Sequence, residues 1–539
     1  MESDSEIKFG HVDRYVKKAI GREGVPGLSI GITDAEHTLW TAAHGFSELE
    51  SKTSATTDDL FQIGSISKFF SSLVLMQLRD EGLIDVRKPV THYLPWFKVH
   101  SKYGRITLHH LLTHTSGLVT GQEESLEGVS EVWALRGTET RVRPGQYFHY
   151  SNHGYKTLGL VMERVTGESY GDLIAKRVLS PLGMTSTEAV ITNDMRSRQA
   201  VGYSPFMDDR PFIPGGRLAP AWWFESGTAD GTICSTPADM CRYLRLLLNG
   251  GRGPHRRIVS EDSFRLMTAP HIRPEDNAHG ESYGYGMNIG KIDGHRCLWH
   301  TGGMIGFHAS VVADLDSKIG VVTMINGPGV PEDVSFFALR TVRSSLEGTK
   351  LPSIPHMPKV PEVKNPRQYA GEYSSEDTKI RISASGKSLW LMRDGRRYRL
   401  VPAGTDRFNA MDSSELYPFR FGRDGARVVE LFHGSKWLVN AKYRGRTRFP
   451  VSKSLHSLAG HYRSTSPWSS NFRVVYRKGG LALIDPYGEE EPLVPIGGGR
   501  FRIGADPRCP ETLVFDMLVD GKPYLAVRSA GRHFRTFTP

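Results

Sequence analysis

The sequence is poor in cysteine and contains no long apolar run. Only four of the 539 residues are cysteine, at positions 234, 241, 297 and 509. These four cysteines show neither the density of a disulfide-stabilised protein nor the paired spacing of metal ligands. We therefore expect their thiols to be reduced. No stretch reaches the roughly 18 apolar residues that a membrane helix needs, and residues 1–8 lack the basic and apolar regions of a signal peptide. We therefore expect a cytoplasmic protein with no membrane partner.

Metal-ligand and nucleic-acid motifs are missing as well. No H-E-x-x-H or comparable spacing occurs, so we expect neither a metal nor a cofactor. The net charge is +10, but residues 366–539 carry 29 Lys and Arg against 17 Asp and Glu, whereas the first 365 residues carry 39 against 41. This basic excess could attract an acidic partner or a membrane surface. The arginines alternate with apolar residues, as in RRYRL at 396–400, which is typical of solvated strand faces, and we expect no nucleic-acid partner.

The chain is long enough for several domains, and its composition marks two boundaries. With 39% hydrophobic and 23% charged residues it resembles a soluble globular protein. Between residues 351 and 361 four prolines recur every third position, which favours an extended linker. We expect a first domain at 1–350 and a linker at 351–365.

Beyond the linker the chain repeats itself. The segment from Tyr369 to Tyr373 (YAGEY) matches the segment from Leu458 to Tyr462 (LAGHY), and further matches follow at offsets that grow slowly from 89 to 94 residues. Each copy alternates apolar and polar residues over short runs broken by Gly, Asp and Pro, which predicts antiparallel strands. We expect two small antiparallel β-barrel domains, at 366–450 and 454–539.

Ser65 and Lys68 carry the first chemical signal, because they stand three residues apart at the start of an apolar segment. On a helix these two side chains share a face and can touch. A serine becomes a nucleophile when a neighbour accepts its proton, and a lysine in a dry pocket can do so. The pair alone is a weak signal, since a capped helix with a solvated lysine has the same pattern.

Two further motifs strengthen it. Tyr150-Ser151-Asn152 precedes a helical pattern, and His300-Thr301-Gly302-Gly303 lies between two strand-like runs. Serine, then tyrosine, then a basic residue with Thr-Gly is the order of motifs in the penicillin-recognising serine hydrolases. Supporting segments are HLLTHTSGL at 110–118, Pro144-Gly145, and GTICSTPADM at 231–240.

On these motifs, residues 8–348 resemble the serine β-lactamase and penicillin-binding-protein superfamily. The similarity is to the branch with tyrosine in motif two, which includes class C β-lactamases and peptidase family S12. In motifs and domain layout the chain is most similar to D-aminopeptidase, in which two lipocalin-like β-barrels follow the catalytic domain. The resemblance implies an α+β fold with a β-lactamase-like antiparallel sheet and a helical subdomain.

The periodicity agrees with that fold class, since strands come first, helices in the middle and strands last. It predicts strands at 27–33, 38–44, 287–289, 296–299, 307–315 and 320–325, and helices at 11–21, 66–81, 154–165, 169–179 and 334–346. The third motif is expected on an edge strand that faces the start of the helix at 66–81.

The resemblance assigns roles to the motif residues. Ser65 attacks a carbonyl, while Lys68 and Tyr150 share the proton transfers, and the choice of base between these two stays open. The backbone N–H groups of Ser65 and Gly303 hold the oxyanion. Asn152 contacts the substrate amide or Lys68.

His300 departs from the lysine that β-lactamases and carboxypeptidases have at this place. A mostly neutral histidine is a weaker anchor for a substrate carboxylate, and it can donate or accept a hydrogen bond. We group it with the catalytic residues, and Thr301, Gly302 and Gly303 with the substrate-binding ones. His-x-Gly is similar to the D-aminopeptidase branch.

Trp222, Trp223 and Phe224 form an aromatic cluster that could line the substrate pocket or plug an interface with a barrel. In D-aminopeptidase a barrel loop limits the substrate to a free amine. Residues 464–471 and 485–491 are the two candidates for such a loop here.

We predict a metal-independent serine hydrolase that forms an acyl-enzyme, most similar to a peptidase or amidase for short peptides or amides with D- or unusual residues. Alternatives within the fold are an esterase, a β-lactamase or a peptide cyclase. An alternative of another class is a non-catalytic scaffold that binds partners through the barrels. The expected partner is a small peptide, amide or ester substrate, and a homo-oligomer is compatible with the sequence.

Overall fold

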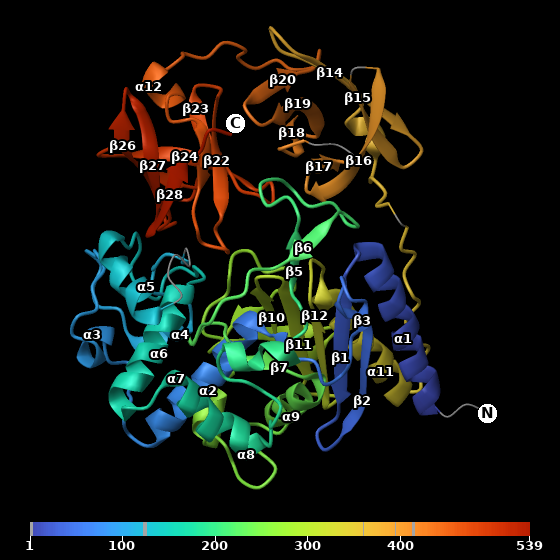
Figure 1. The fold of residues 1–539 in the computed structure, drawn as a ribbon, viewed down its shortest axis with the longest axis vertical. Helices are drawn as coiled ribbons and strands as arrows, with labels where there is room; N and C mark the ends of the chain where they lie inside the picture. Colours follow the sequence, from blue (N-terminus) through green and yellow to red (C-terminus); the bar gives the residue numbers. More distant parts are fainter. Residues whose placement is uncertain (1–3, 122–126, 359, 394, 412–414, 539) are drawn as a thin grey trace. The chain divides into compact units, whose positions relative to one another are not determined.

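The computed structural model describes residues 4–121, 127–358, 360–393, 395–411 and 415–538 (Figure 1). The chain divides into two compact units. The first unit consists of Met1–Ser204, Leu218–Pro355 and Arg508–Pro510. The second consists of Pro205–Arg217, His356–Pro507 and Glu511–Pro539. No pattern in the sequence predicted that Pro205–Arg217 groups with the C-terminal part of the chain. The domain limits at 350, 366 and 454 stay predictions.

An eight-stranded sheet forms the centre of the first unit, in the order β3-β2-β1-β12-β11-β10-β9-β8. Its strands are β1 (Gly27–Thr33), β2 (Thr38–Glu48), β3 (Thr53–Ser54), β8 (Ser282–Tyr283), β9 (Asn288–Ile292), β10 (His295–Met304), β11 (Phe307–Asp314) and β12 (Ile319–Ile325). The first and last strands of the unit meet, because β1 pairs antiparallel with β12 in the register Leu28↔Ile325. Every residue of these two strands is buried, so both faces of the sheet centre are covered.

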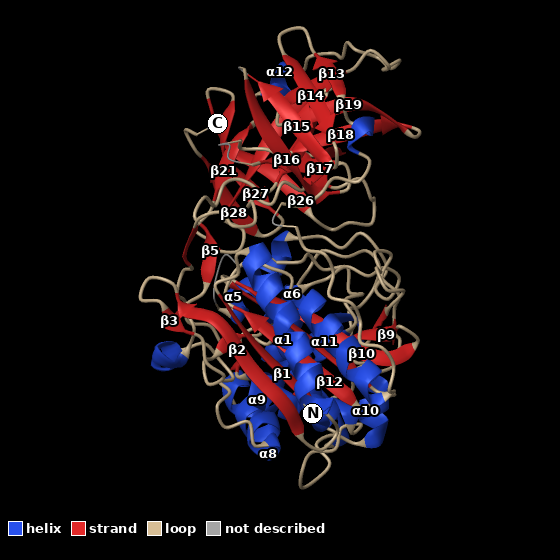
Figure 2. Ribbon diagram, turned by 90° about the vertical axis from the view of Figure 1, so that its right-hand side faces the viewer, coloured by secondary structure: helices blue, strands red, loops and turns tan. Residues whose placement is uncertain are grey.

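Helices cover this sheet and form a subdomain beside it. They are α1 (Asp4–Glu23), α2 (Ser67–Asp80), α3 (Val90–Tyr93), α4 (Leu108–Leu112), α5 (Gly128–Ala134), α6 (Asn152–Thr166), α7 (Tyr170–Ile174), α8 (Ser180–Leu182), α9 (Pro237–Leu248), α10 (Glu261–Met267) and α11 (Pro331–Leu346). Figure 2 shows α1 and α11 side by side, and α11 packs on β12. Two short strand pairs complete the unit, β4 (Phe61–Gln62) with β7 (Cys234–Ser235) and β5 (Tyr203–Pro205) with β6 (Leu218–Pro220).

One predicted helix differs from the structure. The helix expected at 169–179 is α7 followed by a π-helical turn, Ala175–Leu179, which continues into α8. Pro181 has no N–H to donate to the carbonyl four residues earlier, that of Arg177. Gln77 donates its side-chain N–H to that carbonyl instead, at 3.1 Å. The proline thus explains the change of hydrogen-bond register.

The third motif does not lie on the edge strand of the sheet, because β9 and β8 lie beyond β10. The pairing of β9 with β10 ends at Trp299, however. The half of β10 that begins at His300 therefore extends past the end of its neighbour.

The second unit contains two closed antiparallel barrels of eight strands each. The first consists of β13 (Gly371–Ser374), β14 (Lys379–Ser385), β15 (Ser388–Arg393), β16 (Arg396–Gly404), β17 (Arg407–Ala410), β18 (Phe419–Asp424), β19 (Arg427–His433) and β20 (Lys436–Val439). The second consists of β21 (Gly460–Arg463), β22 (Asn471–Arg477), β23 (Gly480–Ile484), β24 (Glu490–Gly497), β25 (Arg500–Ile503), β26 (Thr512–Val519), β27 (Lys522–Arg528) and β28 (Gly531–Arg535), preceded by α12 (Lys453–His456).

The repeat in the sequence corresponds to these barrels. Tyr373 and Tyr462 occupy equivalent positions in the first strand of each barrel, and both are fully buried. Each hydroxyl donates to the carbonyl four residues earlier, Tyr369 at 3.0 Å and Leu458 at 2.8 Å. The expected fold class, a β-lactamase-like sheet with helices followed by two barrels, is confirmed. Over the described residues, no helix has the length and apolar character to cross a membrane.

Candidate active site

Ser65 and Lys68 meet at the start of α2. Ser65 lies in a short 3-10 turn, Gly64–Ile66, which runs directly into the helix. Lys68 is fully buried, and its Nζ donates to Ser65 Oγ at 3.0 Å and to the carbonyl of Asp230 at 2.7 Å. A buried lysine side chain is thus in direct contact with a partly exposed serine hydroxyl, at a distance over which a proton can be exchanged.

The third motif passes against this turn at backbone distance. A Cβ atom added to Gly302 would lie 1.8 Å from the carbonyl oxygen of Ile63, and one added to Gly64 would lie 2.6 Å from the backbone nitrogen of Gly303. Gly64 also has a φ of +54°, which side chains with a Cβ rarely adopt. Both glycines are therefore needed for β10 to lie beside Ser65.

Tyr150 is held beside Lys68 by the turn that the HLLTHTSGL segment forms. Its ring packs on His114 with 4.1 Å between centroids, and Lys68 Nζ lies 5.0 Å from the centre of the Tyr150 ring. His114 Nδ1 accepts the backbone N–H of Ser151 at 3.0 Å. Complete burial lowers the pKa of His114 well below its usual value, so its ring is neutral and can accept this bond.

Ser151 caps the helix that carries the second motif. Its Oγ accepts the N–H of Gly154 at 3.1 Å and donates to the carbonyl of Val119 at 2.7 Å. Asn152 is the first residue of α6 and is partly exposed. The cap fixes the direction in which α6 leaves the site.

His300 is buried, neutral and occupied by two hydrogen bonds. Its Nδ1 donates to the carbonyl of Thr301 at 2.5 Å, and the hydroxyl of Tyr283 donates to its Nε2 at 3.1 Å. Burial first, and the nearby charge of Lys68 second, lower the pKa of His300 to about 4. Burial raises the pKa of Tyr283 well above its usual value, so this phenol stays a donor. No motif in the sequence pointed to Tyr283.

A cavity of about 330 Å³ opens onto these groups. It is lined by Ser65, Phe148, Tyr150, Pro274, Asp276, Glu281, Tyr283, Asn288, His300, Thr301 and Gly303. Its volume is at the lower end of the range for small-molecule sites, about 300–1,000 Å³. Two carboxylates, Asp276 and Glu281, face it, and no lysine or arginine is among the described residues that line it.

The aromatic cluster at residues 222–224 does not form part of the lining described for this cavity. Trp222, Trp223 and Phe224 are not among the described residues that line it. Trp222 is 70% exposed, Phe224 is buried, and Trp223 Nε1 donates to Asn193 Oδ1 at 2.7 Å. A role for these residues in substrate binding stays a prediction. The turns at 464–471 and 485–491 lie in the second unit, between β21 and β22 and between β23 and β24.

Arg508 is a residue that no sequence signal indicated. It groups with the first unit, and its guanidinium donates two hydrogen bonds of 2.6 Å to the two carboxylate oxygens of Glu275. The same guanidinium lies 4.4 Å from the centre of the Tyr147 ring. Glu275 and Tyr147 are sequence neighbours of cavity residues, so Arg508 links two segments of the cavity wall.

A group of three potential metal ligands, His295, Asp314 and Asp316, has ligand atoms within 4.8 Å of one another. Both carboxylates already pair with arginines, Asp314 with Arg343 at 2.6 Å and Asp316 with Arg296 at 2.7 Å. Guanidinium groups in these positions compete with a cation, so the donor set does not fit a metal ion.

The chain is similar to known proteins, by sequence over most of the first unit and, for one solved structure, over 80% of its length. The sequence model of the family described as "Beta-lactamase" matches residues 12–340. Among solved structures, the octameric penicillin-binding protein homologue from Pyrococcus abyssi is 25% identical, with a TM-score of 0.59, and the match covers 80% of this chain and all of that one. The D-amino acid amidase from Ochrobactrum anthropi SV3 is 21% identical with a TM-score of 0.54, covering 64% of this chain and all of that one.

Curated relatives match over a shorter part. Protein flp from Staphylococcus aureus (strain N315) is 24% identical over 326 residues, which are 58% of this chain. The chain spans 62% of the length of that relative.

Proposed function

Because the chain belongs to the beta-lactamase family, we propose that it is a serine hydrolase in which Ser65 forms an acyl-enzyme with short peptides or amides that carry a free amine and D- or unusual residues. The observation that carries the proposal is the 3.0 Å contact between Lys68 Nζ and Ser65 Oγ in a site that opens onto a cavity.

The proposed reaction has two steps. Ser65 Oγ attacks the substrate carbonyl carbon and its proton passes to the Lys68–Tyr150 pair, which returns a proton to the leaving amine as the C–N bond breaks. A water molecule then attacks the acyl-enzyme and the same pair accepts its proton. The pair passes this proton to Ser65 Oγ as the ester bond breaks, which releases the acid and restores the serine. Lys68 Nζ contacts Ser65 Oγ directly, and the Tyr150 ring lies beside Lys68. The group that receives the serine proton has to be deprotonated beforehand, as a neutral Lys68 amine or as a Tyr150 phenolate.

The oxyanion is proposed to bind the backbone N–H groups of Ser65 and Gly303. The close approach of Gly303 to Gly64 supports this, because it brings the two segments together without intervening side chains. Thr301 lines the cavity, which supports its proposed role as a substrate contact. Asn152, at the start of α6, is proposed to contact the substrate amide or Lys68.

The charges around the cavity support a substrate with an amine. Asp276 and Glu281 attract an ammonium group, whereas neutral His300 supplies no cation for a substrate carboxylate. β-Lactams carry such a carboxylate and should acylate Ser65 slowly at best. A site with this charge distribution fits an aminopeptidase or amidase better than a β-lactamase.

Self-association is a separate part of the proposal. A solved relative that covers 80% of this chain is described as octameric, so we propose a homo-oligomer. Light scattering coupled to gel filtration tests it, and a mass of 60.1 kDa in solution would contradict it.

The test combines labelling and substrate comparison. Intact mass after incubation with a fluorophosphonate should rise by one adduct in the natural protein and in Ser67→Ala, a buried neighbouring serine, but not in Ser65→Ala. D- and L-alanine p-nitroanilides with a free amine should be cleaved faster than their N-acetylated forms. Labelling of Ser65→Ala would contradict the nucleophile, and efficient penicillin hydrolysis or a preference for acetylated substrates would contradict the substrate class alone.

A further inference from the structure

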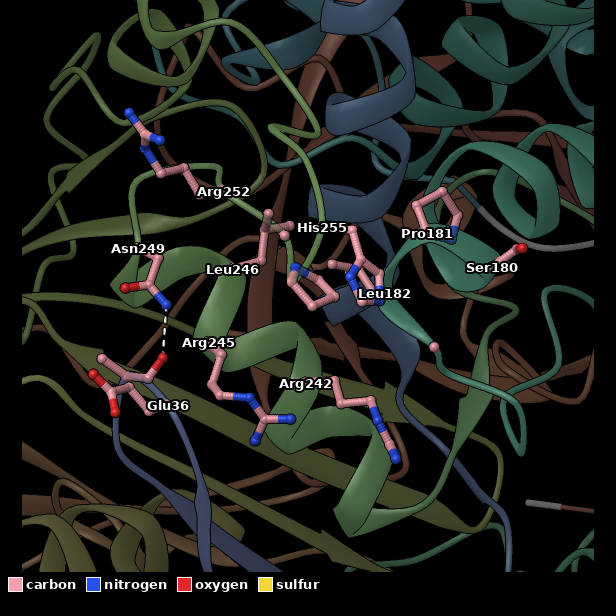
Figure 3. Close-up of a pocket in the computed structure, with 14 residues that line it drawn as sticks. Glu36, Ser180, Pro181, Leu182, Arg242, Arg245, Leu246, Asn249, Arg252 and His255 are labelled. Carbon is pink, nitrogen blue, oxygen red and sulfur yellow. Dashed lines mark hydrogen bonds between the residues drawn. The ribbon is translucent and has the colours of Figure 1, made fainter.

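A second and larger cavity, of about 610 Å³, lies in the first unit (Figure 3). It is lined by Ala35, Glu36, Ser180, Pro181, Leu182, Gly183, Arg242, Arg245, Leu246, Asn249, Arg252, Gly253, Pro254 and His255. These residues come from the turn between β1 and β2, from α8, from α9 and from the loop after α9. None of them is in the candidate active site.

The charge of this cavity is positive. Three guanidinium groups, Arg242, Arg245 and Arg252, line it against one carboxylate, Glu36, a net charge of +2 before His255 is counted. The first 365 residues of the chain carry slightly more acidic than basic side chains, so the concentration of arginines here is local. The active-site cavity has the opposite character, with two carboxylates.

Arg245 lines the cavity, and its side chain is held by hydrogen bonds to two hydroxyl groups and not by a carboxylate of the described residues. Its Nη1 donates to the hydroxyls of Thr33 at 3.2 Å and Thr38 at 3.0 Å. Within the described part of the chain, no ion pair involves Arg245. Burial lowers the pKa of this guanidinium, and the nearby charge of Asp34 opposes that shift only in part. A bound anion would oppose it further.

Arg242 stands one helical turn before Arg245, so both project from the same face of α9. Its Nη1 pairs with Asp239 at 2.7 Å, and this nearly buried carboxylate also accepts the N–H of Ser186 and the hydroxyl of Thr187. One edge of the Arg242 guanidinium is thereby anchored, while its side chain remains 40% exposed.

The end of α9 positions the turn between β1 and β2, which forms another part of the cavity wall. Asn249 Nδ2 donates to the carbonyl of Ala35 at 2.7 Å, which ties the β1–β2 turn to the helix (Figure 3). Arg252 follows in the next loop and is exposed. Apolar side chains of Leu182 and Leu246 cover another part of the cavity.

We propose that this cavity is a second ligand site, which binds a small phosphorylated compound. The planar fork of a guanidinium matches pairs of phosphate oxygens, and three guanidinium groups line this cavity, of which that of Arg242 is already paired with Asp239. The volume suits a small molecule, and the leucines offer contact to its organic part.

Calorimetric titration of the full chain with inorganic pyrophosphate, at constant ionic strength, tests the site. We expect saturable binding of one pyrophosphate per chain. Arg245→Gln and Arg252→Gln should each weaken the affinity about tenfold or more, the scale of one charge-assisted hydrogen bond. Arg256→Gln is the matched control, because Arg256 is an exposed arginine in the same loop that does not line the cavity. Its affinity should stay within about twofold of the natural protein.

Several outcomes would overturn the inference. These are the absence of saturable binding, an equal loss in the Arg256 variant, or unchanged binding in both cavity variants. Citrate binding tighter than pyrophosphate would refute the phosphate class. If Arg245→Gln does not fold, because its bonds to the β1–β2 threonines are lost, Arg252→Gln decides the question on its own, since its guanidinium is exposed.

Discussion

The neutral state of His300 leads to a specific prediction about pH and stability. A histidine with an ordinary pKa of 6.5 is about 90% protonated at pH 5.5, whereas one with a pKa of about 4 is only about 3% protonated. The difference arises because protonation would place a second buried charge beside Lys68 and would break the hydrogen bond that Nε2 accepts from Tyr283. His300→Gln removes the titrating group and retains a polar side chain.

The sign and size of the effect follow from linkage. The folded-state pKa lies below the unfolded one, so the unfolded chain binds the proton more tightly. Neutral His300 therefore makes its full contribution to the stability of the folded protein above pH 6.5. This contribution is lost as the pH falls to about 4 and is absent below that pH. As the pH falls from 6.5 to about 4, the free energy of unfolding decreases by about 3 kcal/mol because of this group. The figure follows from about 1.4 kcal/mol for each tenfold difference in proton affinity between the folded and unfolded chain. The glutamine variant does not suffer this loss.

Thermal unfolding of the full chain from pH 7.5 to pH 4 measures the effect. We expect His300→Gln to be less stable than the natural protein at pH 7.5, because hydrogen bonds are lost, and the difference in melting temperature to shrink as the pH falls below 6.5. Ser151→Ala is the control, since it also removes buried hydrogen bonds but contains no titrating group, and its difference should not depend on pH. A difference for His300→Gln that stays constant or widens on acidification would refute the assignment of a neutral His300.

The remaining predictions concern turnover and the close backbone contact. Ser65→Ala should abolish turnover without lowering the melting temperature, because only a small, partly exposed hydroxyl is removed; residual turnover at the natural rate would exclude the nucleophile. Lys68→Ala and Tyr150→Phe should each lower kcat by about 10² or more, and a change in KM alone would contradict a role in proton transfer. Gly302→Ala should strongly destabilise the first unit or abolish acylation by fluorophosphonate, since its Cβ would lie 1.8 Å from the carbonyl oxygen of Ile63; a stable variant with natural acylation would contradict the observed contact. Incubation with EDTA should leave turnover unchanged, and inhibition that added zinc reverses would contradict a metal-independent reaction.

Features that depend on neighbouring residues along the chain were predictable. The contact of Ser65 with Lys68 requires only that residues three apart share a face at a helix start, and the structure has it at 3.0 Å. The two barrels were predictable because a repeated sequence builds a repeated unit, down to the matching hydrogen bonds of Tyr373 and Tyr462. Periods of two and 3.6 residues likewise indicated most strands and helices of the first unit.

Only the tertiary structure decided which distant side chains surround these elements. The partner of His300 is Tyr283, the partner of Glu275 is Arg508, and Arg245 lies in a cavity with residues from three other segments. The sequence by itself therefore determined the domain types and the candidate nucleophile, since local geometry and periodicity carry that information. The protonation state of His300 and the charges of the two cavities depend on burial and on contacts between residues far apart in the chain, and no local pattern encodes these.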